Sequence, residues 1–214
     1  MGASIPLGKI FGIPIQVNYS WVFIFLLFTY VLADSFSHSD PGWPAAQRWG
    51  IGALTSVLFF LSVLAHELTH SVVAIRKGIP VRGITLFIFG GVSQLAHEAR
   101  RPFTEFLVAV VGPLASLILG AVLFGVWYLV DDVNSTLSAV LFFLATINIS
   151  LGVFNMLPGF PLDGGRVMRA AVWGLTGSYW RATQVATRSG QVIGGLMVIG
   201  GVLLVVFGAG FQSI

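Results

Sequence analysis

Cysteine is absent from this sequence, which excludes disulfide bonds and thiolate metal sites. Charged residues are also scarce: they make up 9% of the 214 residues, whereas soluble globular domains usually carry about 25%. So few charges cannot cover a surface that faces water. Several separate uncharged runs instead approach the roughly 20 residues that cross a bilayer as a helix. The composition therefore predicts a polytopic membrane protein.

Five long apolar segments are separated by more polar stretches. We expect each segment to form a membrane-spanning helix, and a shorter, partly basic helix to lie between the last two. The sequence thus predicts an all-α polytopic membrane protein with five to six transmembrane helices. The expected spans are residues 19–32, 51–75, 103–130, 137–157 and 190–211, and the short helix covers residues 165–175.

The positive charges indicate topology rather than a site for a polyanion. The net charge is +3, but the eleven Lys and Arg residues form no run of the kind that binds nucleic acid. If the N-terminus is cytosolic, ten of the eleven fall in cytosolic loops and Arg48 alone lies outside. Because positively charged loops stay in the cytosol, we expect a multi-pass protein of the cell membrane with a cytosolic N-terminus and no nucleic-acid partner.

The stretch from Ile79 to Leu95 differs from the rest, because its apolar residues alternate with others instead of forming a continuous run. Gly90 and Gly91 supply a two-residue turn signal within it. The sequence therefore predicts a small β-hairpin or sheet on the cytosolic side, directly after the second span.

The second span contains a His-Glu-x-x-His pattern formed by His66, Glu67 and His70. Residues i and i+4 lie on one face of a helix, so both imidazoles can reach one metal ion, with Glu67 close to its open position. Zinc suits two imidazoles and one carboxylate, with a fourth position left for water. Ionisable side chains inside a spanning helix cost on the order of 3 kcal/mol each, so three of them within five residues need a compensating partner. The pattern therefore predicts a metal site.

A third protein ligand is expected where the fourth span ends. Pro158 and Pro161 break the helix there, and Asp163 follows them, directly before two glycines. Irregular backbone at membrane depth survives only where protein buries it or where it lines a watery cavity, which makes Asp163 a plausible ligand. An Asp before a helix is also a common N-cap. The spacing by itself favours neither role.

Together these motifs resemble the site-2 protease family of intramembrane zinc metalloproteases, in the branch that often carries C-terminal CBS domains. The resemblance covers nearly the whole chain and is highly specific in its paired motifs. It rests on four stretches: His66 to His70, Leu86 to Val92, Gly112 to Ser116, and Phe154 to Arg166.

The resemblance implies a site and an activity. His66, His70 and Asp163 would bind one zinc ion per chain. Glu67 would be the catalytic acid or base, and Asn155 would steady the substrate carbonyl or its oxyanion. The protein would then be a zinc endopeptidase that cuts within or next to transmembrane segments, near the cytosolic face. Its expected partners are the lipid bilayer and transmembrane substrates such as anti-sigma factors or membrane-bound transcription-factor precursors, while its oligomeric state stays open.

The predicted hairpin has two candidate roles. A substrate helix must unwind before its peptide bonds can be attacked, and a sheet edge offers replacement backbone partners. Gly90 and Gly91 are therefore candidate substrate-binding residues, with the substrate added as a strand. A hairpin that only packs the catalytic helix is an equal alternative, because a sheet edge in a membrane must be covered.

Two departures from the family pattern stand out. Asn18 occupies a place where many relatives have a histidine, and we expect this to be unimportant for catalysis. The sequence stops at Ile214, where this branch usually continues into another membrane helix and CBS domains. We therefore expect a single membrane-embedded metalloprotease domain over residues 1–214, from either a truncated chain or a minimal natural member.

A membrane zinc transporter is the competing function. It could use the same two histidines and Asp163 as ligands, but it has no need of Glu67 as a base. Many transporters also show internal repeats, and this sequence shows none. A membrane protease that trims prenylated proteins is a second rival, although such enzymes generally take a downstream Glu as the third ligand.

Overall fold

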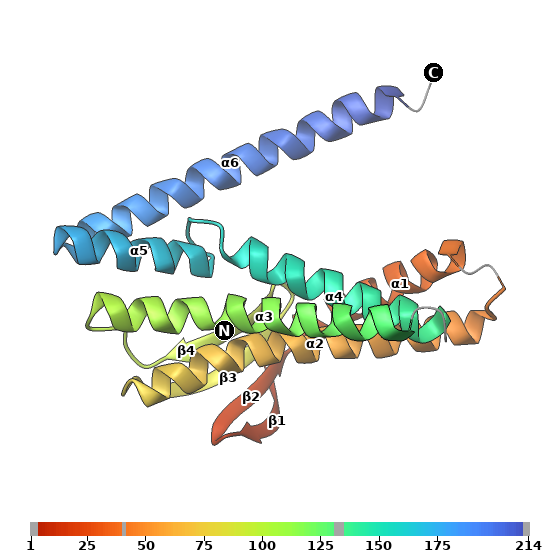
Figure 1. Cartoon of the computed structure of the whole chain (residues 1–214), viewed down its shortest axis with the longest axis horizontal. Coiled ribbons are helices and arrows are strands. Elements are labelled where there is room, and N and C mark those ends of the chain that lie inside the picture. Colours follow the sequence, from red (N-terminus) through yellow and green to blue (C-terminus); the bar gives the residue numbers. More distant parts are fainter. Residues whose placement is uncertain (1–3, 40–41, 131–134, 212–214) are drawn as a thin grey trace. The chain divides into compact units, whose positions relative to one another are not determined.

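The computed structural model describes residues 4–39, 42–130 and 135–211, which form four strands and six helices (Figure 1). In chain order these are β1 (Ser4–Ile10), β2 (Ile13–Asn18), α1 (Ser20–Ser39), α2 (Ala45–Arg76), β3 (Val81–Phe87), β4 (Gly90–Leu95), α3 (Pro102–Val130), α4 (Ser135–Asn155), α5 (Asp163–Thr176) and α6 (Tyr179–Phe211).

The predicted multi-span helical fold is confirmed. In the described part of the chain, five helices are long and apolar enough to cross a membrane, namely α1, α2, α3, α4 and α6. The 14 residues of α5 are too few for a span. α6 begins at Tyr179, well before the expected start at residue 190. The expected start was too late because the first turns of α6 carry polar residues, which lie outside the apolar run.

The chain forms two compact units. The first comprises Met1–Ala99 and Val111–Val153, and the second comprises Arg100–Val110 and Phe154–Ile214. α3 contributes to both, since its first turns belong to the second unit and the remainder to the first.

The first unit contains a four-stranded sheet in the order β1-β2-β3-β4. β1 and β2 are antiparallel, as are β3 and β4, whereas β2 and β3 run parallel, with Ile15 opposite Ile84 and Val17 opposite Leu86. The sheet is therefore larger than the predicted hairpin. β4 and β1 are its two edge strands.

The predicted hairpin of β3 and β4 is confirmed, but its turn lies elsewhere. Phe87 pairs with Gly90, so Ile88 and Phe89 form the turn, and Gly90 and Gly91 begin β4. Gly90 has a φ of 119°, which side-chain-bearing residues rarely adopt. Gly90 therefore allows the backbone conformation at the start of β4 and is not part of the turn.

The sheet packs on α2 next to the histidine motif. Ile84 lies with Leu64 in one buried cluster, and Leu86 lies with Val63 in another. The edge strand β4 is fastened to the same helix because the Ser93 hydroxyl lies 2.8 Å from the Ser71 hydroxyl. The hairpin thus does pack the motif-bearing helix, as one of its two candidate roles required.

Helices of the first unit approach one another closely at small residues. A Cβ added to Gly52 of α2 would lie 3.0 Å from the carbonyl oxygen of Thr29 on α1. A Cβ added to Gly152 of α4 would lie 2.9 Å from the carbonyl oxygen of Pro113 on α3. Small residues at such contacts are typical of membrane helix packing, where backbones must come close.

The second unit contains the loop of residues 156–162, which leads from α4 into α5. The backbone N–H of Phe160 donates a hydrogen bond to the carbonyl oxygen of Ala186 on α6 at 3.1 Å. α5 ends at Thr176 and is capped by Gly177, whose φ of 68° is the left-handed conformation that glycine favours. This cap ends α5 shortly before α6 begins.

Candidate metal centre

The two histidines of α2 are buried side by side. His66 and His70 are each 4% exposed, and their Nε2 atoms are 3.1 Å apart. Their ring centroids are 4.8 Å apart in an edge-on arrangement. The i, i+4 spacing brings both rings to one face of the helix, as the sequence predicts.

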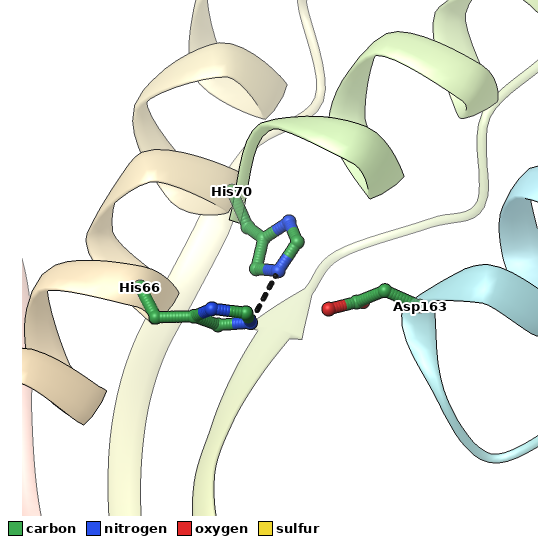
Figure 2. Close-up of side chains that lie close together, drawn as sticks. All are labelled: His66, His70 and Asp163. Carbon is green, nitrogen blue, oxygen red and sulfur yellow. Dashed lines mark hydrogen bonds between the residues drawn. The ribbon is translucent and has the colours of Figure 1, made fainter. Parts of the chain in front are cut away.

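Asp163 is the first residue of α5 and is half-buried. The capping position before this helix is occupied by Leu162, which offers no side-chain hydrogen bond, so Asp163 is not the N-cap that the sequence allowed. The ligand atoms of His66, His70 and Asp163 all lie within 4.8 Å of one another. Figure 2 shows the two rings and the carboxylate directed toward a common point.

This donor set fits a zinc ion. Tetrahedral zinc holds two imidazole nitrogens at about 2.0–2.1 Å, which places them roughly 3.3 Å apart, close to the observed Nε2 separation of 3.1 Å. Two imidazoles and one carboxylate are the three protein ligands of many catalytic zinc sites, which leave a fourth position open. These three residues can therefore hold a metal ion, and zinc suits them by both donor type and spacing.

Ser116 of α3 orients one of the rings. Its hydroxyl lies 2.9 Å from Nδ1 of His66, and the residue is 2% exposed. A histidine ligand usually has such a partner on its second nitrogen, which fixes the ring orientation and tautomer. Here the contact leaves Nε2 of His66 directed toward His70.

Gly112, one turn before Ser116, makes room for the same two rings. A Cβ at this position would lie 2.1 Å from Nε2 of His70 and 2.8 Å from Nε2 of His66. Any side chain at residue 112 would thus occupy the space of the ligand atoms. Both Gly112 and Ser116 belong to a stretch that carries the family resemblance, but the sequence gives no contact partner for either, so their roles were missed.

Glu67 lies beside the edge strand of the sheet. It is half-buried, and a Cβ added to Gly91 of β4 would lie 2.6 Å from its Cγ. One turn further along α2, the Ser71 hydroxyl donates to the carbonyl oxygen of Glu67 and lies 2.8 Å from the Ser93 hydroxyl. The absence of a side chain at Gly91 therefore lets the Glu67 carboxylate arm lie against β4.

The remaining predicted site residues are not part of the ligand group. Asn155 is the half-buried last residue of α4. Gly90 is the half-buried first residue of β4. Within the described residues, the group that could hold a metal consists of His66, His70 and Asp163.

Comparison with known proteins places these motifs in a family context. The family model of peptidase family M50 matches residues 54–133 and 130–198. Rip3 of Mycobacterium tuberculosis, named for zinc metalloprotease activity, is 42% identical over 195 residues, which are 90% of this chain and 50% of that protein. A Synechocystis protein with a similar name is 39% identical over 200 residues, which are 92% of this chain and 52% of its own.

A solved structure has the same fold. The site-2 protease from Methanocaldococcus jannaschii is 34% identical in sequence and superposes with a TM-score of 0.66, covering 94% of this chain and 86% of its own. The chain spans about half the length of the Mycobacterium and Synechocystis relatives.

Proposed function

Because the chain belongs to peptidase family M50, we propose that it is an intramembrane zinc metalloprotease that hydrolyses peptide bonds within or next to transmembrane segments of other membrane proteins. The observation that carries the proposal is the ligand group: two buried imidazoles and a carboxylate lie within 4.8 Å of one another, and Glu67 is adjacent to one of the histidines on the same helix. This arrangement is the one that hydrolytic zinc sites need.

His66, His70 and Asp163 are the proposed ligands of one zinc ion per chain. When bound, zinc supplies a Lewis acid that polarises a carbonyl group and acidifies water. The chain's own contribution is to hold the three ligands in place. Ser116 does so for His66 through its 2.9 Å contact with Nδ1, and Gly112 keeps the space beside both rings clear.

Glu67 is the proposed general base and acid. A carboxylate next to the ligands can accept the proton of the attacking water and then deliver a proton to the leaving amine. Its contact with Gly91 supports this role. The Glu67 side chain lies against β4, which restricts its position, and it is only half-buried, so solvent can reach it. Asn155 is the proposed donor to the oxyanion, since a preorganised amide N–H stabilises negative charge as it develops on the substrate oxygen.

The edge of β4 is the proposed binding site for the unwound substrate, with Gly90 and Gly91 at its start. β4 is an edge strand in the order β1-β2-β3-β4, and Gly91 lies against Glu67. A substrate strand added at this edge would therefore run past the proposed base. Packing of the hairpin on α2 does not compete with this role, because the packing uses side chains of β3 and β4, whereas an added strand would use the backbone of β4.

The proposed topology, domain extent and substrates of the protein follow from its charges and its family. The five candidate spans mark a multi-pass membrane protein, and the distribution of Lys and Arg supports a cytosolic N-terminus. The family model extends over segments of both compact units, which supports one metalloprotease domain. Anti-sigma factors and membrane-bound transcription-factor precursors are the proposed kinds of substrate.

The first experiment compares the wild type with Glu67→Gln, both purified in detergent. Each is assayed for bound zinc and for cleavage of a single-pass membrane substrate. We expect both proteins to hold one zinc per chain and only the wild type to cut, because the substitution removes the base and no ligand. If both bind zinc and neither cuts any membrane substrate, the protease proposal fails and a zinc transporter becomes the better explanation.

The strand proposal is tested separately at Ser93. Phe87 and Gly90 close the two-residue turn as a hydrogen-bonded pair, so alternation along the ladder leaves the N–H of Ser93 facing the free edge. Ser93→Pro removes this donor together with the hydroxyl contact to Ser71, whereas Ser93→Ala removes the hydroxyl contact alone. We expect at least about tenfold slower cleavage for the proline variant at unchanged zinc content. Equal cleavage by the two variants would show that the substrate does not use this edge.

A further inference from the structure

A buried ion pair lies in the second unit, away from the ligand group. Glu105, in the first turn of α3, is 1% exposed, and Arg169, in the middle of α5, is 8% exposed. The Nε–H of Arg169 donates to Oε1 of Glu105 at 2.7 Å, and its Nη2–H donates to the same oxygen. A buried ion pair adds little net stability, because desolvation offsets the attraction, so its presence calls for a role other than stability.

The same guanidinium also contacts two aromatic rings. Arg169 lies over Phe160 at 5.0 Å from the ring centroid, and over Tyr179 at 4.8 Å. Phe160 belongs to the loop before α5, and Tyr179 is the first residue of α6. One side chain thus joins α3, the loop and α6, and Glu105 fixes where that side chain points.

The loop of residues 156–162 packs tightly against α6 and the start of α5. A Cβ added to Gly190 of α6 would lie 2.0 Å from the carbonyl oxygen of Phe160, and one added to Gly165 would lie 2.4 Å from the carbonyl carbon of Gly159. The backbone N–H of Phe160 also donates to Ala186. Backbone therefore packs directly on backbone on both sides of the loop.

In the sequence, Asp163 lies between Phe160 and Arg169, and the contacts above hold both of these residues in place. It follows Phe160 by three residues and precedes Arg169 by six, which is about 9 Å along a helix. When both ends of so short a segment are held, the carboxylate between them has few alternative positions. A ligand that is already in place loses less conformational freedom when the metal binds.

We propose that Glu105 and Arg169 are positioning residues that hold Asp163 ready to bind the metal. This inference rests on the proposed zinc site, and it assigns to the pair the task of holding Asp163 in place before the metal binds. Groups that hydrogen-bond a metal ligand directly contribute about 10- to 100-fold to metal affinity. The pair acts on Asp163 through the backbone of α5 and the loop, and we expect its loss to weaken zinc binding within the same range.

The test is a double-mutant cycle read out as zinc affinity, measured by competition with a chelator on the full chain in detergent. The four proteins are the wild type, Glu105→Gln, Asp163→Asn and the double variant. We expect Glu105→Gln to weaken zinc binding about 10- to 100-fold in the wild-type background and to have little further effect beside Asp163→Asn. Equal weakening in both backgrounds, or none in either, would overturn the inference, because a residue that acts through Asp163 cannot act once Asp163 is gone.

Two further measurements keep the cycle interpretable. Glu105→Gln leaves a buried guanidinium opposite an amide, so Glu105→Gln combined with Arg169→Met serves as a variant without buried charge, and we expect it to fold and to show the same loss of zinc affinity. Arg181→Gln, on the exposed side of α6, removes a positive charge from the same unit and is expected to leave zinc affinity unchanged. If Asp163→Asn itself binds zinc like the wild type, the proposed ligand set is wrong and the inference falls with it.

Discussion

The proposed metal ligands of the two compact units are positioned in different ways. In the first, both histidines stand on one continuous helix, whose periodicity sets their spacing. In the second, Asp163 follows an irregular loop that contacts α6 through Phe160 and the side chain of Arg169 on α5. A helix therefore positions ligands by local geometry, whereas a loop needs tertiary contacts. We therefore expect the histidine pair to be disturbed most by a group that enters the space of its rings, and Asp163 to be disturbed by any change that moves its loop.

The largest expected effect comes from direct intrusion at Gly112. Gly112→Ala places a Cβ on the helix backbone 2.1 Å from Nε2 of His70 and 2.8 Å from Nε2 of His66, and that Cβ cannot move without moving α3. Both rings must leave their positions. We expect zinc affinity to fall by more than about 100-fold, beyond the usual effect of changing an outer contact. Chelator competition measures the loss.

Gly125→Ala is the matched control for this change. It makes the same substitution on the same helix, at a position where an added Cβ meets nothing within 4 Å. Alanine is the better helix former of the two residues, so neither variant should suffer from helix propensity. Wild-type zinc affinity in Gly112→Ala would show that the rings can leave this space without loss, and the site geometry described above would be wrong.

A smaller effect is expected when the loop of the second unit is disturbed. Gly190→Ala puts a Cβ 2.0 Å from the carbonyl oxygen of Phe160, so the loop must shift, while the histidine pair keeps its surroundings. We expect zinc affinity to fall about 10- to 100-fold, together with a lower melting temperature, because overpacking of close contacts costs about 1–3 kcal/mol. Gly194→Ala, in open space on the same helix, should change neither quantity. Lower stability at unchanged zinc affinity would separate the loop from the metal site.

The contrast between the units also explains what the sequence could predict. The spans, the short helix and the His66–His70 pair follow from apolar runs and helical spacing, which are local properties. The role of Asp163 could not be decided from spacing, because the choice between ligand and N-cap depends on where α5 begins and what its first residue faces. Gly112 and Ser116 were missed for the same reason: their importance comes from atoms of α2, some 45 residues earlier.

The sheet shows the same limit. The hairpin of β3 and β4 is local and was predicted, although its turn was misplaced onto Gly90 and Gly91. β1 and β2 were not predicted, because β2 reaches β3 through a parallel pairing between residues 15–17 and 84–86. In the sequence the apolar residues Ile13, Ile15 and Val17 alternate with other residues, and this alternation, which matches their burial in β2, is the signal that could have revealed the strand.

Gly91→Ala probes the first unit without touching a ligand. The new Cβ would lie 2.6 Å from Cγ of Glu67, so the carboxylate arm must turn away from β4. We expect cleavage to slow about tenfold, which is less than the loss of a general base itself, while zinc affinity stays at the wild-type level. Gly50→Ala, in open space on α2, is the control. A fall in zinc affinity equal to the fall in cleavage would mean that Gly91 supports the ligands rather than Glu67.

Among the changes expected to lower zinc affinity, Ser116→Ala should have the smallest effect. The substitution removes the partner of Nδ1 of His66 but leaves the helix that sets the ring spacing. We therefore expect zinc affinity to fall about tenfold, at the lower end of the range for outer contacts. Ser62→Ala, whose hydroxyl donates to the carbonyl oxygen of Phe59 in its own helix, should have no such effect. If Ser116→Ala weakened zinc binding as much as Gly190→Ala, the histidine pair would depend on tertiary contacts as strongly as Asp163 does, and helix periodicity alone would not be what holds it in place.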